Sequence, residues 1–275
     1  MTPADGAVAE VTTLRLGAGG RVAASDRLAV EAPLEIRIDG ASFTVLMRTP
    51  GDDEELVAGF LHTEGIVADA AGIESITRPA TMPEDDCRNF LEVRLAPGIA
   101  RPAERTFYAS ASCGVCGKNS IADLAVRAPA VTSALKVEAA VLAELPQRLL
   151  AAQAAFAETG GLHAAGLFGA DGGLVAVRED VGRHNTVDKL VGWALGERRL
   201  PLADSVLVVS GRLGFEIVQK AIVAGVPVVA GVGAASTLAV SLAESHGLTL
   251  ASFVRDGRMN LFGEVGRVVG APAPR

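Results

Sequence analysis

Two cysteines three positions apart are the residues of this sequence best suited to chemistry. Cys113 and Cys116 lie in the glycine-rich run ASCGVCGK, which occupies residues 111–118. Their spacing brings the two sulfur atoms close together, and the glycines allow a tight turn that leaves the sulfurs accessible. Lys118, or the start of a helix near residue 119, would lower the pKa of a nearby cysteine and so favour the nucleophilic thiolate.

The motif by itself is compatible with three chemistries: dithiol–disulfide exchange, half of a zinc site, and carriage of sulfur as a persulfide. A zinc site needs about two more ligands, but there is no second CxxC and the four histidines are scattered along the chain. A thioredoxin-like motif follows a strand and opens a helix in a βαβ unit, whereas this one precedes the α/β region. Two inert buried thiols are the structural alternative. The third cysteine, Cys87, lies in a polar stretch and is interpreted as incidental.

Four polar loops in the last third of the chain carry arginines, most of them where predicted strands end. In an open α/β sheet, loops at the carboxyl ends of the strands share one crevice. Helix N-termini there present free N–H groups to phosphate, and arginine adds paired donors. Together the loops predict a phosphorylated, nucleotide-like ligand, although each loop alone is also compatible with surface ion pairs and turns. The loops span residues 178–185, 210–212, 231–237 and 253–258, and their arginines are Arg178, Arg183, Arg212, Arg255 and Arg258.

Three features in or next to these loops lead to separate predictions. His184 is expected to be an oriented hydrogen-bond group rather than a metal ligand. Just beyond it, Asp188 and Lys189 are interpreted as an ordinary ion pair on a helix surface. The run GVGAAS from residue 231 is similar to a GxGxxG phosphate loop, but it ends in serine and is weak evidence when taken alone.

The distribution of charge narrows the classes of partner. The 275 residues carry 25 Lys and Arg against 32 Asp and Glu, a net charge of −7. Residues 1–177 hold 14 basic and 23 acidic residues, a balance of −9, whereas residues 178–275 hold 11 and 9, a balance of +2. A duplex-DNA binder is therefore not expected, because neutralising phosphates needs clustered basic residues. The C-terminal third is where a small anionic ligand would be held.

The cellular location follows from what the sequence lacks. No run of about 18 apolar residues could span a membrane. The first ten residues have neither the basic nor the apolar region of a secretory signal, so we expect a cytoplasmic protein. Three cysteines are too few for a disulfide scaffold, and a reducing compartment favours a catalytic or metal-binding role for the close pair.

The elements that must position these residues follow from periodicity and turn signals. Residues 33–48 read as a hairpin, and a helix begins near Asp52. Residues 138–158 predict two helices that meet at Pro146, because proline costs the interior of a helix about 3 kcal/mol. Apolar runs that alternate with helices after residue 163 predict a parallel α/β sheet covered on both faces. We divide the chain into a loose segment (1–28), a β-rich α+β subdomain (29–105) and an α/β domain that carries the CxxC loop (106–275).

The motifs, taken in chain order, resemble the FdhD family of formate dehydrogenase accessory sulfurtransferases. The resemblance covers about residues 30 to 260, and the run EDVGRHN is far more specific than a bare CxxC. The matching segments are Glu31–Ile36, Asp53–Leu61 with Glu64–Ile66, Ser112–Gly117, Glu179–Asn185 with Asp188 and Lys189, and Ser210–Arg212.

The resemblance implies a carrier that receives sulfur from a cysteine desulfurase. The sulfur would pass to the molybdenum cofactor, in its bis(molybdopterin guanine dinucleotide) form, for formate dehydrogenase. Cys113 matches the family's persulfide cysteine, and Cys116 is its partner in the motif. The resemblance also implies a cytidine-deaminase-like fold and a homodimer. We expect no permanently bound metal, and neither a nucleic acid nor a membrane as a partner.

The resemblance and the polar loops together define the expected cofactor site. Residues 253–258 match the family's cofactor-binding loop, in which Phe253 would stack on guanine. The predicted cofactor-binding residues are Phe253, Val254, Arg255, Asp256, Gly257, Arg258, Arg183, His184, Ser210 and Arg212.

Some positions depart from the family pattern and from the implied fold's own chemistry. Zinc deaminases need H-x-E followed by P-C-x-x-C, but residues 163–165 read His-Ala-Ala, so deamination is not expected. Gly214, Gly233, Ala235 and the pair Phe262-Gly263 differ from the residues common in the family. The alternatives to sulfur transfer are a cofactor chaperone without sulfur chemistry, a zinc-binding structural protein and a thiol oxidoreductase.

Overall fold

The larger part of the structure is built on one six-stranded sheet. The structure, a computed structural model, describes residues 6–79, 83, 87–102 and 128–271, so the CxxC motif with Cys113 and Cys116 lies outside the described residues. The strand order is β13-β12-β11-β10-β8-β9, with β10, β11 and β12 parallel and the other neighbours antiparallel. The strands are β8 (His163–Phe168), β9 (Leu174–Asp180), β10 (Val206–Val209), β11 (Val228–Gly231), β12 (Thr249–Arg255) and β13 (Arg258–Gly263).

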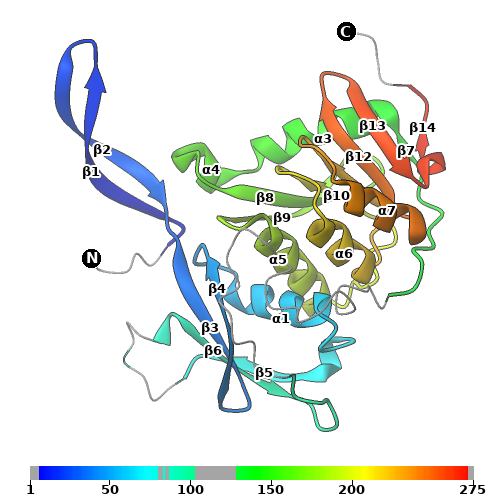
Figure 1. Cartoon of the computed structure of the whole chain (residues 1–275), viewed down its shortest axis with the longest axis horizontal. Coiled ribbons are helices and arrows are strands. Elements are labelled where there is room, and N and C mark those ends of the chain that lie inside the picture. Colours follow the sequence, from blue (N-terminus) through cyan, green and yellow to red (C-terminus); the bar gives the residue numbers. More distant parts are fainter. Residues whose placement is uncertain (1–5, 80–82, 84–86, 103–127, 272–275) are drawn as a thin grey trace.

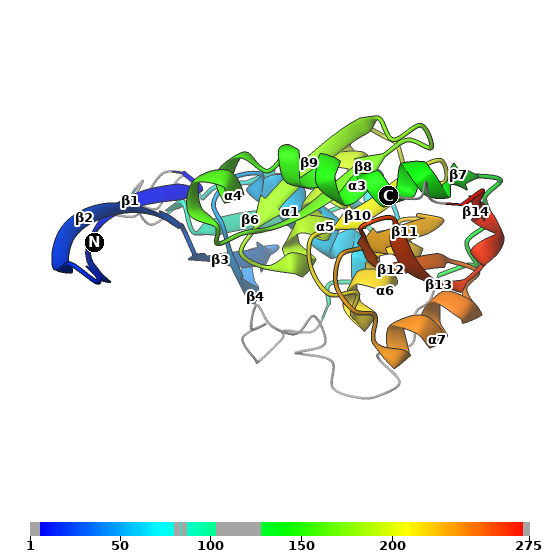
Figure 2. The ribbon, with the colours of Figure 1, turned by 90° about the horizontal axis from the view of Figure 1, so that it is seen from above.

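Helices cover both faces of this sheet, as the continuous apolar strands predict. On one face, α5 (Arg183–Gly196), α6 (Phe215–Val223) and α7 (Thr237–Ser245) pack against alternate residues such as Leu207 and Val229. On the other face, α3 (Ala139–Ala151) packs against the intervening residues (Figures 1 and 2). The prediction of an α/β fold with helices on both faces is therefore confirmed, but the sheet is mixed, because only β10, β11 and β12 are parallel. The likeness to cytidine deaminase stays a prediction.

A smaller sheet forms the second layer of structure. Its order is β4-β3-β6-β5, and the expected hairpin of residues 33–48 corresponds to its strands β3 and β4. Helix α1 packs on this sheet and closes an apolar core around Leu34, Phe43 and Leu56. The elements are β3 (Ala32–Ile38), β4 (Ala41–Arg48), α1 (Asp53–Thr63), the 3-10 helix Ala70–Gly72, β5 (Ile73–Thr77) and β6 (Phe90–Leu95).

Residues 8–29 differ from the loose segment predicted for residues 1–28. Strands β1 (Val8–Gly17) and β2 (Gly20–Ala29) pair in register over ten residues each and project from the body of the molecule (Figures 1 and 2). Side chains such as Leu14 and Leu16 remain exposed. Because neither face of the hairpin is covered by a core, its sequence lacks the alternation of a half-buried strand. The domain boundaries near residues 28 and 105 stay predictions.

The prediction that helices meet at Pro146 is wrong. Helix α3 runs through Pro146, and the break follows Ala151, before α4 (Ala154–Thr159). Leu145, Pro146 and Leu149 are all buried against the sheet, so the burial of this face outweighs the lost helical hydrogen bond. After α7 and β13, the 3-10 helix Val265–Arg267 and β14 (Val268–Val269) complete the chain, and β14 pairs with β7 (Val137–Glu138).

The two sheets are joined where α1 crosses α5. A Cβ on Gly59 would overlap the carbonyl oxygen of Asp188, and a Cβ on Gly192 would overlap that of Glu55. The backbones can approach this closely only because both residues lack a side chain. Arg178 reinforces the contact, since its guanidinium donates to both carboxylate oxygens of Glu55 at 2.6 and 2.8 Å.

We predict that Gly59→Ala or Gly192→Ala destabilises the protein by about 2 kcal/mol or more, because the added methyl group must push the two helices apart. Urea unfolding measures the change. Gly196→Ala is the matched control: this glycine is also in α5, but its Cβ position has nothing within 4 Å, so alanine is expected to be neutral or to stabilise by about 0.5 kcal/mol. Equal effects of the three substitutions would show that the crossing does not depend on these glycines.

Candidate functional site

The first two residues of the EDVGRHN run organise the backbone around the site. The carboxylate of Glu179 accepts hydrogen bonds from the backbone N–H groups of Ala155 and Phe156 at 2.9 and 2.7 Å, which caps the start of α4. Asp180 is fully buried, and its carboxylate receives four donors. These are the ammonium of Lys189 at 2.8 Å, the N–H groups of Thr49 and Gly182 at 3.1 and 2.8 Å, and the amide of Asn185 at 2.8 Å.

The interpretation of Asp188 and Lys189 as a surface ion pair is wrong. Both side chains are buried, and each pairs with a different partner. Lys189 pairs with Asp180, while Asp188 accepts from Lys220 Nζ at 2.8 Å and from the hydroxyl of Thr63 at 2.7 Å. Burial raises the pKa of Asp188, and the nearby Lys220 ammonium opposes that shift. These residues therefore hold the helices together and do not face a ligand.

The loop after β10 and the side chains of His163 and Arg183 lie close together at the start of α5. A Cβ on Gly211 would lie 3.5 Å from His163 Nδ1 and 3.6 Å from Arg183 Cδ. Ser210 lies beside them, since its Oγ accepts from the N–H of Ala164 at 2.9 Å. Arg183 also donates from Nε to Glu216 at 2.8 Å. The structure thus brings two predicted site residues, Arg183 and Ser210, together with His163, which the sequence reasoning did not select.

The order of strands in the sheet explains why His163 lies in the site. β8 is antiparallel to β10, so its first residue must lie next to the carboxyl end of β10, where Ser210 begins the next loop. The sequence periodicity identifies both strands but not their pairing. His163 could therefore be placed in the site only once the sheet order is known.

The two histidines of this site are neutral because of burial and surrounding positive charge. Burial lowers the pKa of His163, and the charges of Arg183 and Arg212 lower it further. Burial, with the charges of Lys220 and Arg183, lowers the pKa of His184 to about 3. Within the described residues, the buried Nδ1 of His184 has no hydrogen-bond partner. The positive charges that add to the effect of burial on these two pKa values also favour binding of an anion.

The glycine loop of residues 231–237 lies against two of the other loops. A Cβ on Gly233 would lie 2.7 Å from the carbonyl oxygen of Gly211, and the N–H of Phe253 donates to the carbonyl oxygen of Gly233 at 3.1 Å. This close approach explains why glycine occupies position 233 in this chain. At Gly214 the nearest atoms to a Cβ would be those of the Glu216 carboxylate that pairs with Arg183, so a side chain there would displace this carboxylate.

The segment 253–258 turns at the end of β12. Phe253 has a φ of 52°, in the left-handed region that non-glycine residues rarely adopt, and its side chain is 41% exposed. The guanidinium of Arg255 lies 5.9 Å from the centre of its ring. Asp256 and Gly257 also have positive φ angles, of 53° and 68°. Residues 256 and 257 form an ordinary two-residue hairpin turn between the paired residues Arg255 and Arg258. The unusual backbone position in this segment is therefore Phe253 alone.

Two of the sequence-selected residues have other surroundings. The side chain of Val254 is buried in the core between the sheet and α3, so it does not present a surface to a ligand. Arg178 is held by Glu55 and by Asp52 at 3.5 Å, and the hydrogen bond to Glu55 raises its pKa. Arg212, Arg255 and Arg258 are exposed. The available positive charge therefore comes from fewer arginines than the loops contain.

The described part of the chain also bears on membrane-spanning and metal-binding functions. Among those residues, no helix is long and apolar enough to cross a membrane. The same residues contain no cluster of three or more His, Cys, Asp or Glu side chains that could hold a metal ion. Cys87 is of intermediate exposure.

Comparison with known proteins gives matches over most of the chain. "Sulfur carrier protein FdhD" of Mycolicibacterium paratuberculosis is 51% identical over 263 residues, which cover 92% of this chain and 96% of the relative. The protein of the same name from Streptomyces coelicolor is 48% identical over 263 residues, 93% of each chain. The crystal structure of a proposed formate dehydrogenase accessory protein from Desulfotalea psychrophila has a TM-score of 0.75 at 25% identity and covers 95% of this chain and 99% of its own.

The family comparison agrees with these relatives. The model of the FdhD/NarQ family matches residues 29–269, a range that includes the CxxC motif, the EDVGRHN run and the 253–258 loop. The chain therefore belongs to the FdhD/NarQ family.

Proposed function

We propose that this protein carries sulfur, as a persulfide on Cys113, from a cysteine desulfurase to a molybdenum cofactor destined for formate dehydrogenase. The observation that carries the proposal is the similarity, over more than nine-tenths of the chain, to relatives named sulfur carrier protein FdhD. The cofactor class is the bis(molybdopterin guanine dinucleotide) form, whose phosphates suit the basic loops. We expect a cytoplasmic homodimer with a cytidine-deaminase-like fold.

The sulfur chemistry needs only the two thiols of the CxxC motif and a thiol reductant. The Cys113 thiolate attacks the outer sulfur of the donor persulfide, whose S–S bond breaks so that the donor leaves as a thiolate. In delivery, the Cys116 thiolate attacks the inner sulfur of the Cys113 persulfide and releases hydrosulfide to the cofactor. This second step leaves a Cys113–Cys116 disulfide, which a cellular dithiol then reduces.

The loops around the start of α5 support a binding role for the nucleotide part of the cofactor. Exposed Arg212 and the N–H groups at the start of α5 offer donors to phosphate. The neutral imidazoles of His163 and His184 add hydrogen bonds without filling the site with fixed charge. The exposed ring of Phe253, held in a strained backbone conformation, offers a flat surface for a guanine base.

We predict that incubation with a cysteine desulfurase and cysteine adds about 32 Da, one sulfur atom, to the Cys113 peptide, and that a reductant removes it. Mass spectrometry of the wild-type protein, Cys113→Ala and Cys116→Ala measures the adduct. Cys87→Ala is the matched control and should load like the wild type. Loading on Cys87 instead of Cys113 would contradict the proposal.

The same Cys113→Ala variant separates sulfur transfer from the alternative of a cofactor chaperone. If sulfur passes through Cys113, formate dehydrogenase in cells that carry the variant should lack activity while its polypeptide accumulates normally. Full activity would mean that the protein binds and delivers the cofactor without sulfur chemistry.

We predict that Arg212→Ala weakens binding of guanosine diphosphate by about tenfold, because one charge-assisted hydrogen bond is lost. Isothermal titration calorimetry at two salt concentrations measures the affinity, which should fall as salt is raised. Arg94→Ala is the matched control, since Arg94 is an exposed arginine on β6 in the smaller sheet. Equal affinities for the two variants would remove Arg212 from the site.

A further inference from the structure

The hairpin of β1 and β2, here called the arm (residues 8–29), has no part in the sulfur chemistry or cofactor binding described above. Its strands pair over ten residues each, so the arm is about 34 Å long. Its base packs on α4, where Arg27 pairs with Glu158 at 2.6 Å, and the rest projects from the body of the molecule (Figures 1 and 2). A two-stranded hairpin alone is at best marginally stable in water, so the arm needs a surface to pack against.

The arm exposes large apolar side chains. Leu14 is 67% exposed and Leu16 is 77% exposed, and the strand register places both on one face, here called the leucine face. Val22 and Leu28 lie on the opposite face and are 62% and 46% exposed. Exposed apolar surface marks an interaction site, and on an uncovered pair of strands it promotes aggregation. A partner that covers the arm permanently therefore suits it better than one that binds briefly.

The size of the arm is that of one side of a stable interface. It comprises residues 8–29, and a standard protein–protein interface uses about 20–30 residues on each side. In a dimer with two-fold symmetry both copies contribute the same surface. Two arms packed against each other would therefore supply an interface of ordinary size.

The outer part of the arm is basic. Residues 14–22 contain two arginines and no acidic residue. Of the three arginines in the arm, Arg15 lies 3.8 Å from Asp26, and Arg27 pairs with Glu158 at the base. Arg21 has no ion-pair partner among the residues that the structure describes. The tip therefore offers an unpaired positive charge to a partner.

The leucine face carries the complementary charge at its base. Glu10 is exposed on this face, and its carboxylate accepts a hydrogen bond from the hydroxyl of Ser25. The register pairs Arg21 with Leu16, six residues beyond Glu10 on β1, so the two charges are about 20 Å apart. They are too far apart to meet within one arm. Two arms that run antiparallel would bring Arg21 of each copy to Glu10 of the other.

We propose that two copies of this chain dimerise by packing the leucine faces of their arms against each other in antiparallel orientation. Leu14 and Leu16 of both copies are then buried, and Arg21 and Glu10 pair twice across the two-fold axis. A second copy suits the arm better than a different protein, because the arm complements itself in charge and every copy needs the same cover. The inference rests on the proposed function in that a homodimer is expected there, and it assigns the interface.

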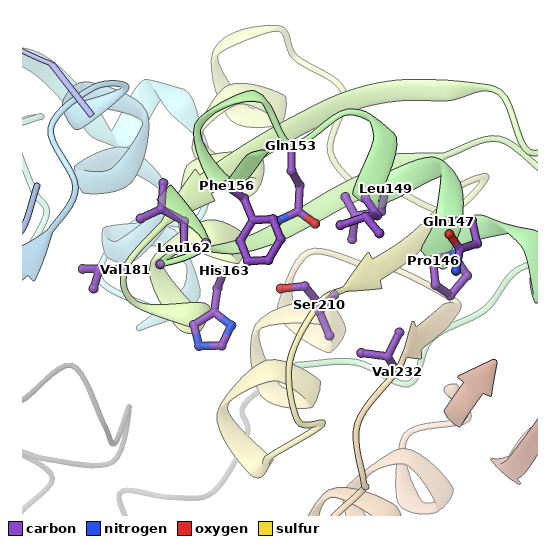
Figure 3. A pocket seen from close by; sticks show the side chains of 14 residues that line it. Pro146, Gln147, Leu149, Gln153, Phe156, Leu162, His163, Val181, Ser210 and Val232 are labelled. Carbon is purple, nitrogen blue, oxygen red and sulfur yellow. The ribbon is translucent and has the colours of Figure 1, made fainter. Parts of the chain in front are cut away.

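The position of α4 decides where test substitutions are placed. This helix packs on the base of the arm, and it also supplies Phe156, whose ring lines a cavity of about 470 Å³ between α3 and α4. Gln153, His163 and Ser210 line the same cavity (Figure 3). A change in α4 would thus affect the site as well as the arm, so the variants below leave α4 unchanged.

Light scattering of the full-length protein at micromolar concentration should give twice the chain mass of 28.1 kDa. Leu14→Asp with Leu16→Asp should weaken dimerisation at least about a hundredfold, because charges replace buried leucines. The circular dichroism spectrum should not change, since both leucines lie outside the cores. Leu174→Asp with Val175→Asp is the matched control on exposed β9 surface and should remain dimeric. A monomeric wild type, or a dimer that survives the leucine substitutions, would overturn the inference.

Charge reversal tests the antiparallel arrangement. Arg21→Glu or Glu10→Arg alone should weaken dimerisation by about tenfold or more, because like charges then meet at two symmetric contacts. An equimolar mixture of the two variants should dimerise like the wild type, since both contacts again join opposite charges. Glu74→Arg is the control, as this exposed residue lies on β5 in the smaller sheet. Failure of the mixture to restore the dimer would overturn the arrangement proposed.

Sulfur loading of Cys113 keeps this inference separate from the proposed function. Loading in a protein whose dimer does not depend on Leu14 and Leu16 would overturn the inference and leave sulfur carriage standing. An arm-dependent dimer that never acquires sulfur would support the inference and overturn the proposed function.

Discussion

The buried carboxylate of Asp180 is the interaction on which the site depends. A charge in the protein interior is tolerated only when hydrogen bonds and an opposite charge replace water. Asp180 meets this condition with four donors that come from three regions: Thr49 after the smaller sheet, Gly182 and Asn185 at the start of α5, and Lys189 one turn later. Satisfying this one carboxylate therefore sets the position of the helix start relative to both sheets.

The site is built outward from that buried centre. Glycines at the crossing of α1 and α5 let the two helices approach, and the same motif that holds Asp180 also supplies Glu179 to cap α4. One wall of the cavity and the start of α5 are thus positioned by consecutive residues. The long EDVGRHN run has a mainly structural role, because only Arg183 and His184 within it belong to the predicted cofactor-binding residues. Specific motifs can therefore mark a scaffold as much as a catalytic centre.

Local patterns in the sequence predicted where helices and strands form better than they predicted what packs against them. The hairpin of residues 33–48 and the helix after Asp52 were confirmed, because their periodicity reflects one buried face. The alternating strands and helices after residue 163 were also confirmed, because continuous apolar runs mark strands that are buried on both faces. Pro146 misled the prediction, since burial of the α3 face outweighs the lost hydrogen bond. The hairpin of residues 8–29 was missed because no core covers it and so no apolar alternation is needed.

The sequence by itself determined the residue types: two close cysteines, a basic C-terminal third with glycine-rich loops, and a specific motif that points to the FdhD/NarQ family. Only the tertiary structure decided which charges are available. It buries Asp188 and Lys189, pairs Arg178 with Glu55, and brings His163 beside Ser210 and Gln153 into a cavity. The physical reason is that the free energy of a charge or amide depends on burial and on partners, and many of these partners are more than a hundred residues away in the chain.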